Sequence, residues 1–320
     1  MSDREGRPIV LVAMGGHAFI QRGEKGDIRD HMHNAEAICG SLMTLIERDY
    51  NLVVTHGNGP QVGNLLLQNE LTRDNVASMP LDVLVANTEG FLGYVLQQAL
   101  LNHLRRREIK RYVVTMITQV LVERDDAAFQ SPSKPIGPFL TREQAEERRD
   151  RLGWRIIEDS GRGWRRLVAS PRPVRVVQRL MIRESARAGH IVVACGGGGI
   201  PIIRNRDNDY EGIEAVIDKD LTSSVLAAEI DSELLIILTD VPQVYVHYGK
   251  PDQKPLGAVT LEEIEALQAA GHFAKGSMGP KVEAIVNFLK AGGKRGLITS
   301  PARLTDAMDG RAGTHFIGRI

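Results

Sequence analysis

Three short glycine-containing stretches each follow an apolar run that is typical of a buried β-strand. They are Gly15-Gly16-His17, Gly57-Asn58-Gly59-Pro60 and Gly196–Gly199. Glycine lets backbone N–H groups approach a partner closely, and a glycine loop after a strand is a common phosphate site in α/β proteins. Each stretch alone also fits an ordinary tight turn or helix start. Three of them after parallel strands would meet at one edge of the sheet, so together they predict an anion pocket in which His17 donates to a phosphoryl oxygen.

Three lysines supply the cations that such a pocket requires. Asp218 and Asp220 flank Lys219 at an expected helix start, where two carboxylates hold one ammonium group, although an Asp there also fits an N-cap. Lys281 is expected in the first turn of a helix, where a cation opposes the helix dipole, which favours an anionic ligand. Lys134 is expected in a stiff loop bracketed by prolines. Glycine loops and lysines are typical of phosphoryl transfer, in which a protein aligns two substrates and neutralises charge.

Several familiar nucleotide-binding motifs are absent from the sequence. It contains no G-x-x-x-x-G-K-[ST] P-loop, no protein kinase signature and no G-x-G-x-x-G after the first apolar run. The chemistry therefore belongs to another class of phosphotransferase.

The composition is that of a globular protein. Of the 320 residues, 42% are hydrophobic and 25% are charged, which suits one large domain or two modest ones. Lys plus Arg and Asp plus Glu number 40 each, and aromatic residues make up 5%, so neither charge nor stacking surface favours a nucleic acid partner.

No apolar run in the sequence approaches the roughly 20 residues that span a bilayer. The N-terminal segment has no signal-peptide pattern, and the two cysteines lack metal-like spacing. We expect a reduced, cytoplasmic protein with no membrane partner and no metal ligands among its side chains.

The elements that hold these residues alternate between strand and helix, which predicts an α/β sandwich around a mostly parallel sheet. The expected strands are residues 8–14, 51–57, 111–122, 190–196, 233–241 and 295–300. The expected helices cover about residues 34–49, a segment after Pro60, and residues 89–107, 174–188, 221–230, 261–270 and 280–291. Residues 123–175 break this rhythm. They are polar and hold both tryptophans, Trp154 and Trp164, so we interpret them as an inserted lid rather than a linker.

Seven segments in sequence order resemble the motifs of carbamate kinases, members of the amino acid kinase superfamily. They are HGNGPQVGNLLLQ, KPIGPFLT, GRGWRRLVASP, CGGGGIPI, EAVIDKDL, GHFAKGSMGPKVEA and GTHFIG. The resemblance runs along nearly the whole chain. It implies a three-layer α/β/α sandwich, usually a homodimer, that transfers a phosphoryl group between ATP and carbamate with Mg²⁺. It also implies an acceptor half at residues 1–122 and 176–200, a lid at 123–175 and a nucleotide half at 201–320.

The resemblance implies a role for each matching residue. The acceptor and the transferred phosphate would be lined by Gly15, Gly16, Gly57, Asn58, Gly196 and Gly197. Lys134 would reach from the lid to the phosphoryl group, Lys219 and Lys281 would stabilise the donor phosphates, and Asp220 would orient the lysines. The nucleotide would be bordered by Thr239, Asp240, Val241, Tyr245 and Met278.

The chain departs from the family pattern at three positions. His17 stands where the family has Asn, Glu89 replaces the Gln of T-Q-G, and Pro242 replaces the second Asp of T-D-V-D. One interpretation is sequence drift with activity retained. A second is a related kinase with another acceptor, in which His17 favours a phosphate or phosphonate group and Glu89 favours a cationic group. A third, a nucleotide sensor without catalysis, is disfavoured because the three lysines are present.

Overall fold

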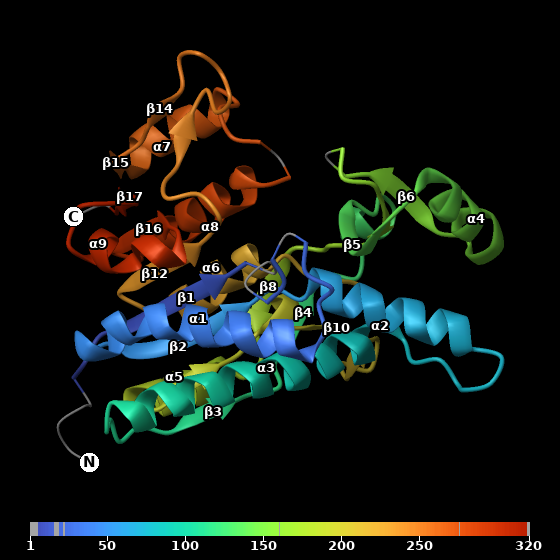
Figure 1. The fold of residues 1–320 in the computed structure, drawn as a ribbon, viewed down its shortest axis with the longest axis horizontal. Helices are drawn as coiled ribbons and strands as arrows, with labels where there is room; N and C mark the ends of the chain where they lie inside the picture. The colour runs from blue at the N-terminus through green and yellow to red at the C-terminus, as the bar shows by residue number, and fades with distance from the viewer. Residues whose placement is uncertain (1–5, 16–18, 22, 160, 275, 319–320) are drawn as a thin grey trace.

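The computed structural model describes residues 6–15, 19–21, 23–159, 161–274 and 276–318. Its centre is an eight-stranded sheet in the order β15-β17-β16-β12-β1-β2-β9-β3 (Figure 1). Neighbouring strands pair in parallel, except for β16 and β17. The strands are β1 (Ile9–Met14), β2 (Asn51–His56), β3 (Val113–Thr115), β9 (Ile191–Val193), β12 (Leu234–Leu238), β15 (Ala258–Thr260), β16 (Arg295–Thr299) and β17 (Thr314–Ile317).

Helices cover both faces of this sheet, as β1 illustrates. Its residues Val10 and Val12 join an apolar core with α1, α3 and α9, whereas Leu11 and Ala13 join a second core with α5, α6, α7 and α8. Alternate strand residues therefore face opposite layers, which confirms the three-layer α/β/α sandwich. The helices are α1 (Ile28–Glu47), α2 (Gly59–Thr72), α3 (Leu81–Arg106), α4 (Arg142–Leu152), α5 (Arg179–Arg187), α6 (Lys219–Glu229), α7 (Leu261–Ala269), α8 (Met278–Lys290) and α9 (Leu304–Met308).

Two helices begin earlier than their apolar periodicity predicted. The helix predicted from residue 34 begins at Ile28, because Asp27 and Asp30 form a capping box ahead of the apolar stripe. The helix predicted from residue 89 begins at Leu81, directly after Pro80. In the described part of the chain, no helix combines the length and apolarity that crossing a membrane requires.

Two predicted elements are divided. The run 111–122, predicted as one strand, forms β3 and then β4 (Gln119–Val122), which lies in a second sheet of order β11-β10-β4-β8. The segment 174–188, predicted as one helix, starts as β8 (Pro173–Val176), and α5 begins only at Arg179. The two errors share a cause, because β4 and β8 pair with each other and no local pattern shows that pairing. The remaining strands of this sheet are β10 (Ile200–Arg204) and β11 (Tyr210–Gly212).

The insertion forms a small subdomain with its own sheet, at the place where the sequence predicted a lid. A three-stranded sheet of order β5-β7-β6 packs with α4 and projects beside α2 (Figure 1). Its strands are β5 (Lys134–Leu140), β6 (Arg155–Glu158) and β7 (Trp164–Val168). The predicted loop around Lys134 is wrong, since Lys134 begins β5. A hairpin of β13 (Tyr245–Val246) and β14 (Lys254–Pro255) follows β12.

Candidate active site

The strand order brings the predicted loops to one edge of the sheet. β12, β1, β2 and β9 are parallel neighbours, so the residues that follow their carboxyl ends lie along the same edge. Those residues include Asp240, Gly15, Gly57 and Gly196, in that order. The next residues of the first loop, Gly16 and His17, lie outside the described residues.

The amino terminus of α6 forms the centre of the site. The Asp218 carboxylate is the N-cap and accepts hydrogen bonds from the backbone N–H groups of Asp220, at 2.9 Å, and Leu221, at 3.3 Å. An N-cap carboxylate satisfies free donors of the first turn and suits the positive end of the helix. Lys219 and Asp220 are the first two helical residues, and both are buried. Because Asp218 caps α6, the neighbouring residues Lys219 and Asp220 are fixed in the first turn of the helix.

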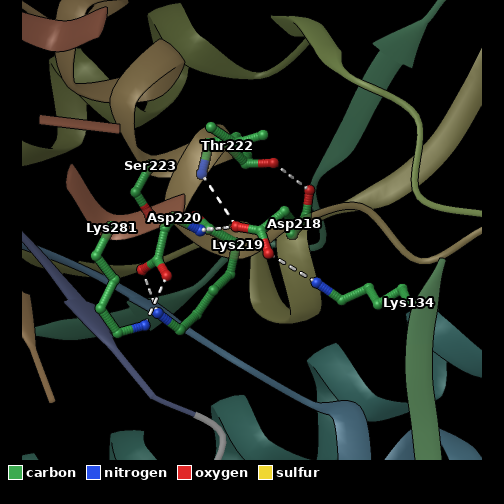
Figure 2. A network of polar contacts seen from close by, with 9 residues as sticks. Lys134, Asp218, Lys219, Asp220, Thr222, Ser223 and Lys281 are labelled. Carbon is green, nitrogen blue, oxygen red and sulfur yellow. Dashed lines mark hydrogen bonds and ion pairs between the residues drawn. The ribbon is translucent and has the colours of Figure 1, made fainter. Parts of the chain in front are cut away.

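Asp220 holds two of the three predicted lysines. Lys219 Nζ donates to Asp220 Oδ1, and Lys281 Nζ, from α8, donates to Asp220 Oδ2 at 2.9 Å (Figure 2). The Asp220 side chain is only 4% exposed, so this bridging is shielded from water. The predicted orienting contacts of Asp220 are present in the structure.

Asp218 holds the third lysine, a pairing that the sequence did not predict. Lys134 Nζ, at the start of β5, donates to Asp218 Oδ2 at 2.9 Å (Figure 2). One carboxylate thus caps α6 through Oδ1 and joins the lid to the core through Oδ2. The sequence Ile217-Asp218-Lys219-Asp220 contained a sign of this pairing. An N-cap carboxylate uses one oxygen for the helix, so the second oxygen of Asp218 was left for another donor.

The buried carboxylates and lysines of this cluster shift one another's pKa values. Burial raises the pKa of both carboxyls, but the lysines outweigh it: Lys134 and Lys219 lower the pKa of Asp218, and Lys219 and Lys281 lower that of Asp220. Burial lowers the pKa of Lys219, although Asp220 opposes this effect. For Lys281, the attraction of Asp220 outweighs burial, and the pKa is raised. Both carboxylates are therefore ionised at neutral pH, and three lysines share them.

Hydroxyl groups fix α6 against the glycine loops. Thr222 Oγ1 donates to the carbonyl of Gly198 at 2.8 Å, and the hydroxyls of Thr55 and Ser223 lie 2.6 Å apart. These contacts join α6 to the 196–199 run and to β2. They set the distance between the lysines and the loops at the edge of the sheet.

The four consecutive glycines have a packing reason in this structure. Gly197, Gly198 and Gly199 have φ of 67°, 96° and 87°, a left-handed region that favours glycine. A Cβ on Gly197 would lie 2.1 Å from Asn58 Nδ2, and one on Gly198 would lie 2.5 Å from the carbonyl oxygen of Ile217. All four are buried. The run therefore packs two loops and the approach to α6 closely together, in addition to the predicted role of Gly196 and Gly197 in lining the site.

Two adjacent residues of α3 connect the second and third glycine loops. Thr88 Oγ1 accepts a hydrogen bond from Asn58 Nδ2 at 2.8 Å, and Glu89 Oε2 accepts one from the backbone N–H of Thr118 at 2.8 Å. Thr118 Oγ1 in turn accepts from the N–H of Cys195, at 3.1 Å, next to the glycine run. Sequence reasoning missed Thr88.

Glu89 is buried rather than displayed to a ligand. It is 2% exposed, and among the described residues no group hydrogen-bonds its Oε1. Burial raises its pKa well above the usual range of a carboxyl. This geometry does not favour the expected contact between Glu89 and a cationic acceptor group.

The predicted nucleotide-bordering residues lie beyond β12 and at the start of α8. Thr239 is bonded through its backbone N–H to the Thr299 carbonyl at 2.9 Å, and the side chain of Asp240 is exposed. Val241 is half-buried, and so is Tyr245, the first residue of β13. Met278 is the first residue of α8, one turn before Lys281. Of these residues, Asp240 lies close enough to Lys281 to help raise its pKa, and Met278 shares α8 with that lysine.

The chain matches a protein family model in sequence and several solved structures in fold. The amino acid kinase family model matches residues 8–300. The carbamate kinase of Thermococcus kodakarensis is 45% identical over 311 residues, which cover 96% of this chain and 98% of that protein.

Among solved structures, the chain is similar to carbamate kinase from Giardia lamblia bound to citric acid, with a TM-score of 0.94, 39% identity and coverage of 98% of this chain and 100% of the other. The same enzyme bound to AMP-PNP gives a TM-score of 0.90 at 40% identity, with coverage of 98% and 100%. With the lysine cluster and the glycine loops in place, these matches show that the chain belongs to the amino acid kinase family and, within it, to the carbamate kinases.

Proposed function

We propose that this protein catalyses reversible phosphoryl transfer between ATP and carbamate. The observation that carries the proposal is the convergence of Lys134, Lys219 and Lys281 on the two aspartates at the start of α6, beside the glycine loops. In the direction of ATP synthesis, an oxygen of the ADP β-phosphate attacks the phosphorus of carbamoyl phosphate. The bond from phosphorus to the carbamoyl oxygen breaks, and carbamate leaves to decompose to ammonia and CO₂.

Each lysine has a role that its element supports. Lys134 comes from the lid and neutralises the transferred phosphoryl group, whereas Lys219 and Lys281 stabilise the donor phosphates. Asp220 keeps those two lysines in place. We assign residues 1–122 and 176–200 to the acceptor and 201–320 to the nucleotide, with Thr239, Asp240, Val241, Tyr245 and Met278 bordering it. In support, AMP-PNP binds to the similar Giardia lamblia enzyme.

Mg²⁺ fits this reaction as a companion of the nucleotide. No group of three or more His, Cys, Asp or Glu side chains among the described residues is placed to hold a metal ion. Asp218 and Asp220 are already engaged by lysines. Mg²⁺ would therefore be held mainly by phosphate oxygens and water, as is common for this ion.

We further propose a homodimer in the cytoplasm. β3 lies at one edge of the eight-stranded sheet, and Tyr112 beside it is 76% exposed, which leaves that edge available to a second copy. Cys39 and Cys195 are free buried thiols, as suits a reducing compartment.

The test is ATP formation from ADP and carbamoyl phosphate with Mg²⁺, using the native chain and His17→Asn. Rapid ATP formation by the native chain supports the proposal. Little activity that His17→Asn restores would mean an intact site tuned to another acceptor, the alternative that His17 motivates. Inactivity of both would overturn the proposal.

A further inference from the structure

The glycine run of residues 196–199 is fastened at both ends to Thr118. Thr118 Oγ1 accepts a hydrogen bond from the N–H of Cys195 at 3.1 Å, and the Thr118 carbonyl accepts one from the N–H of Ile200 at 2.8 Å. The Thr118 hydroxyl also donates to the carbonyl of Met116 at 2.7 Å, which fixes its rotation. The position of Thr118 therefore sets the position of the glycine run.

The carboxyl group of Glu89, in α3, holds Thr118 and the glycine run together. Its Oε2 accepts the N–H of Thr118 at 2.8 Å, and the N–H of Gly196 also donates to this carboxyl. A Cβ built on Gly196 would lie 3.0 Å from Glu89 Cγ, so the side chain packs directly against the first glycine of the run. One buried carboxyl of α3 therefore fixes the run both directly and through Thr118.

Among the residues that the structure describes, no cation pairs with the Glu89 carboxyl. Residues 113–122 and 196–203, which include its hydrogen-bond donors, contain no ionisable side chain. Lys219 of α6 donates to Asp220 instead. A negative charge on Glu89 would therefore be buried without a partner, which is an unfavourable state in a protein interior.

Two titratable groups lie next to the carboxyl, and both are neutral. The Cβ that would contact Glu89 from Gly196 would also lie 2.6 Å from Nε2 of His56, at the end of β2. Burial lowers the pKa of His56 to about 4, and burial raises the pKa of the Cys195 thiol well above its usual range. Neither group carries a charge near pH 7, so burial dominates and raises the pKa of Glu89 well above the usual range of a carboxyl.

We infer that Glu89 is a neutral carboxylic acid that positions the glycine run for the acceptor, and that loss of its proton at alkaline pH lowers turnover. A protonated carboxyl has one oxygen that accepts N–H groups and one that carries a hydrogen, as a Gln amide has an oxygen and an N–H₂ group. Oε2 is the acceptor, and Oε1, which has no partner among the described residues, is free to carry the proton. Glu89 acts through Thr118 and Gly196, so it is a positioning residue. The inference rests on the proposed function only for the reaction in which turnover is measured.

Glu229 provides a matched control. Its carboxyl also accepts a backbone hydrogen bond, from the N–H of Val176 at 3.0 Å, and burial raises its pKa as well. It is the last residue of α6, at the opposite end of that helix from Lys219. Glu229→Gln therefore removes a similar carboxyl proton at a distance from the lysine cluster.

The first experiment measures kcat and both KM values against pH in the native chain, Glu89→Gln, Glu89→Ala and Glu229→Gln. Native turnover should fall as the pH rises through the pKa of Glu89, by about tenfold per pH unit above it, whereas Glu89→Gln should escape this loss. Glu229→Gln should lose turnover as the native chain does. Near pH 7, Glu89→Ala should raise the KM for carbamoyl phosphate by about fivefold or more with the KM for ADP within about twofold, and Glu89→Gln should restore the native value.

Two further readouts do not depend on turnover. Infrared difference spectra between the native chain and Glu89→Gln should show the C=O stretch of a protonated carboxylic acid at pH 7, and this band should disappear at alkaline pH. Amide hydrogen exchange over residues 193–203, followed by mass spectrometry, should be faster in Glu89→Ala than in Glu89→Gln, because only Gln keeps the acceptor for the N–H groups of Thr118 and Gly196.

Identical pH profiles in the native chain and Glu89→Gln would overturn the inference. The absence of a protonated carboxyl band at pH 7 would do the same, as would equal hydrogen exchange in Glu89→Ala and Glu89→Gln. If the native chain does not turn over carbamoyl phosphate, the proposed function fails, and the infrared and exchange measurements still decide the role of Glu89. The band together with faster exchange in Glu89→Ala would then support that role, and the lack of either would overturn it.

Discussion

Asp220 accepts hydrogen bonds from lysines of two different helices, so its carboxylate determines where both ammonium groups point. Under the proposed function, nucleotide phosphates would compete with that carboxylate for the same donors. Because Asp220 holds Lys219 and Lys281 through hydrogen bonds, both ammonium groups are preorganised for phosphate under the proposed function.

Lys134→Ala should lower kcat by about 100-fold or more while ADP affinity stays within about twofold, because the lid lysine acts on the transferred group. Steady-state kinetics and ADP titration by calorimetry would measure the two effects. Asp218→Asn is the companion variant: Asn still caps a helix well, and Lys134 is retained, so turnover should fall less. Parallel losses of turnover and ADP affinity in Lys134→Ala would contradict the assigned role.

Lys281→Ala should weaken ADP binding by about tenfold, since it removes a charge-assisted contact with the donor phosphates. It also leaves Asp220 with Lys219 alone. Calorimetric titration with ADP measures this effect, and titration with adenosine provides the control, because adenosine carries no phosphate. Unchanged ADP affinity would show that Lys281 does not face the nucleotide.

Glu89→Gln should become more stable relative to the native chain as the pH rises. Burial raises the pKa of Glu89 in the folded state, so the folded chain binds this proton more tightly than the unfolded chain. The native chain therefore loses stability as the pH rises above the unfolded pKa of about 4.3, by up to about 1.4 kcal/mol per pH unit, whereas Gln has no proton to lose. Urea unfolding of both proteins at pH 5, 6 and 7 measures the difference. A difference that does not change with pH would show that Glu89 keeps no proton.

The lid is attached to α2 through a close backbone contact. A Cβ on Gly63 would lie 2.0 Å from the Cα of Gly137 in β5, so helix and strand approach as closely as glycine permits. Nearby, Trp154 Nε1 of the lid donates to both carboxylate oxygens of Glu70, at 3.0 Å each. The position of β5 sets the position of Lys134, so this attachment links the lid to the chemistry.

Gly63→Ala should displace the lid and lower turnover while the core stays folded. Both tryptophans of the chain, Trp154 and Trp164, lie in the lid, so tryptophan fluorescence reports the displacement and far-ultraviolet circular dichroism reports the core. Gly90→Ala in α3 is the control, because a Cβ there meets nothing within 4 Å. Native-like fluorescence and turnover in Gly63→Ala would mean that the close contact does not position the lid.

The assembled molecule depends on its last strand. β17 lies between β15 and β16, so this end of the eight-stranded sheet is complete only when residues 314–317 are in place. Phe316 of this strand is 1% exposed and belongs to the same core as α6 and α8, the helices that carry Lys219 and Lys281. The packing of β17 therefore supports the two helices that hold Lys219 and Lys281.

Phe316→Ala should reduce the free energy of unfolding by about 3–5 kcal/mol, the usual cost of a large cavity in a core. Ile317→Ala, whose parent side chain is 44% exposed, should cost about 1 kcal/mol or less. Urea denaturation of both variants measures the contrast. Similar losses in the two variants would mean that the core around β17 is loosely packed.

Much of the protein was predictable from local pattern alone. The central strands, the glycine loops after three of them, the helix starts near Lys219 and Lys281 and the inserted subdomain each depend on neighbouring residues, through apolar runs, glycine and capping side chains. Other features depend on contacts between residues far apart in sequence. Lys134 and its partner Asp218 are separated by 84 positions, and residues 111–122 divide between two sheets because β4 pairs with β8 and β10. Local propensity carries no information about such distant partners. Only the tertiary structure therefore shows these pairings and the approach of Arg165, in the lid, to Gly59, in α2.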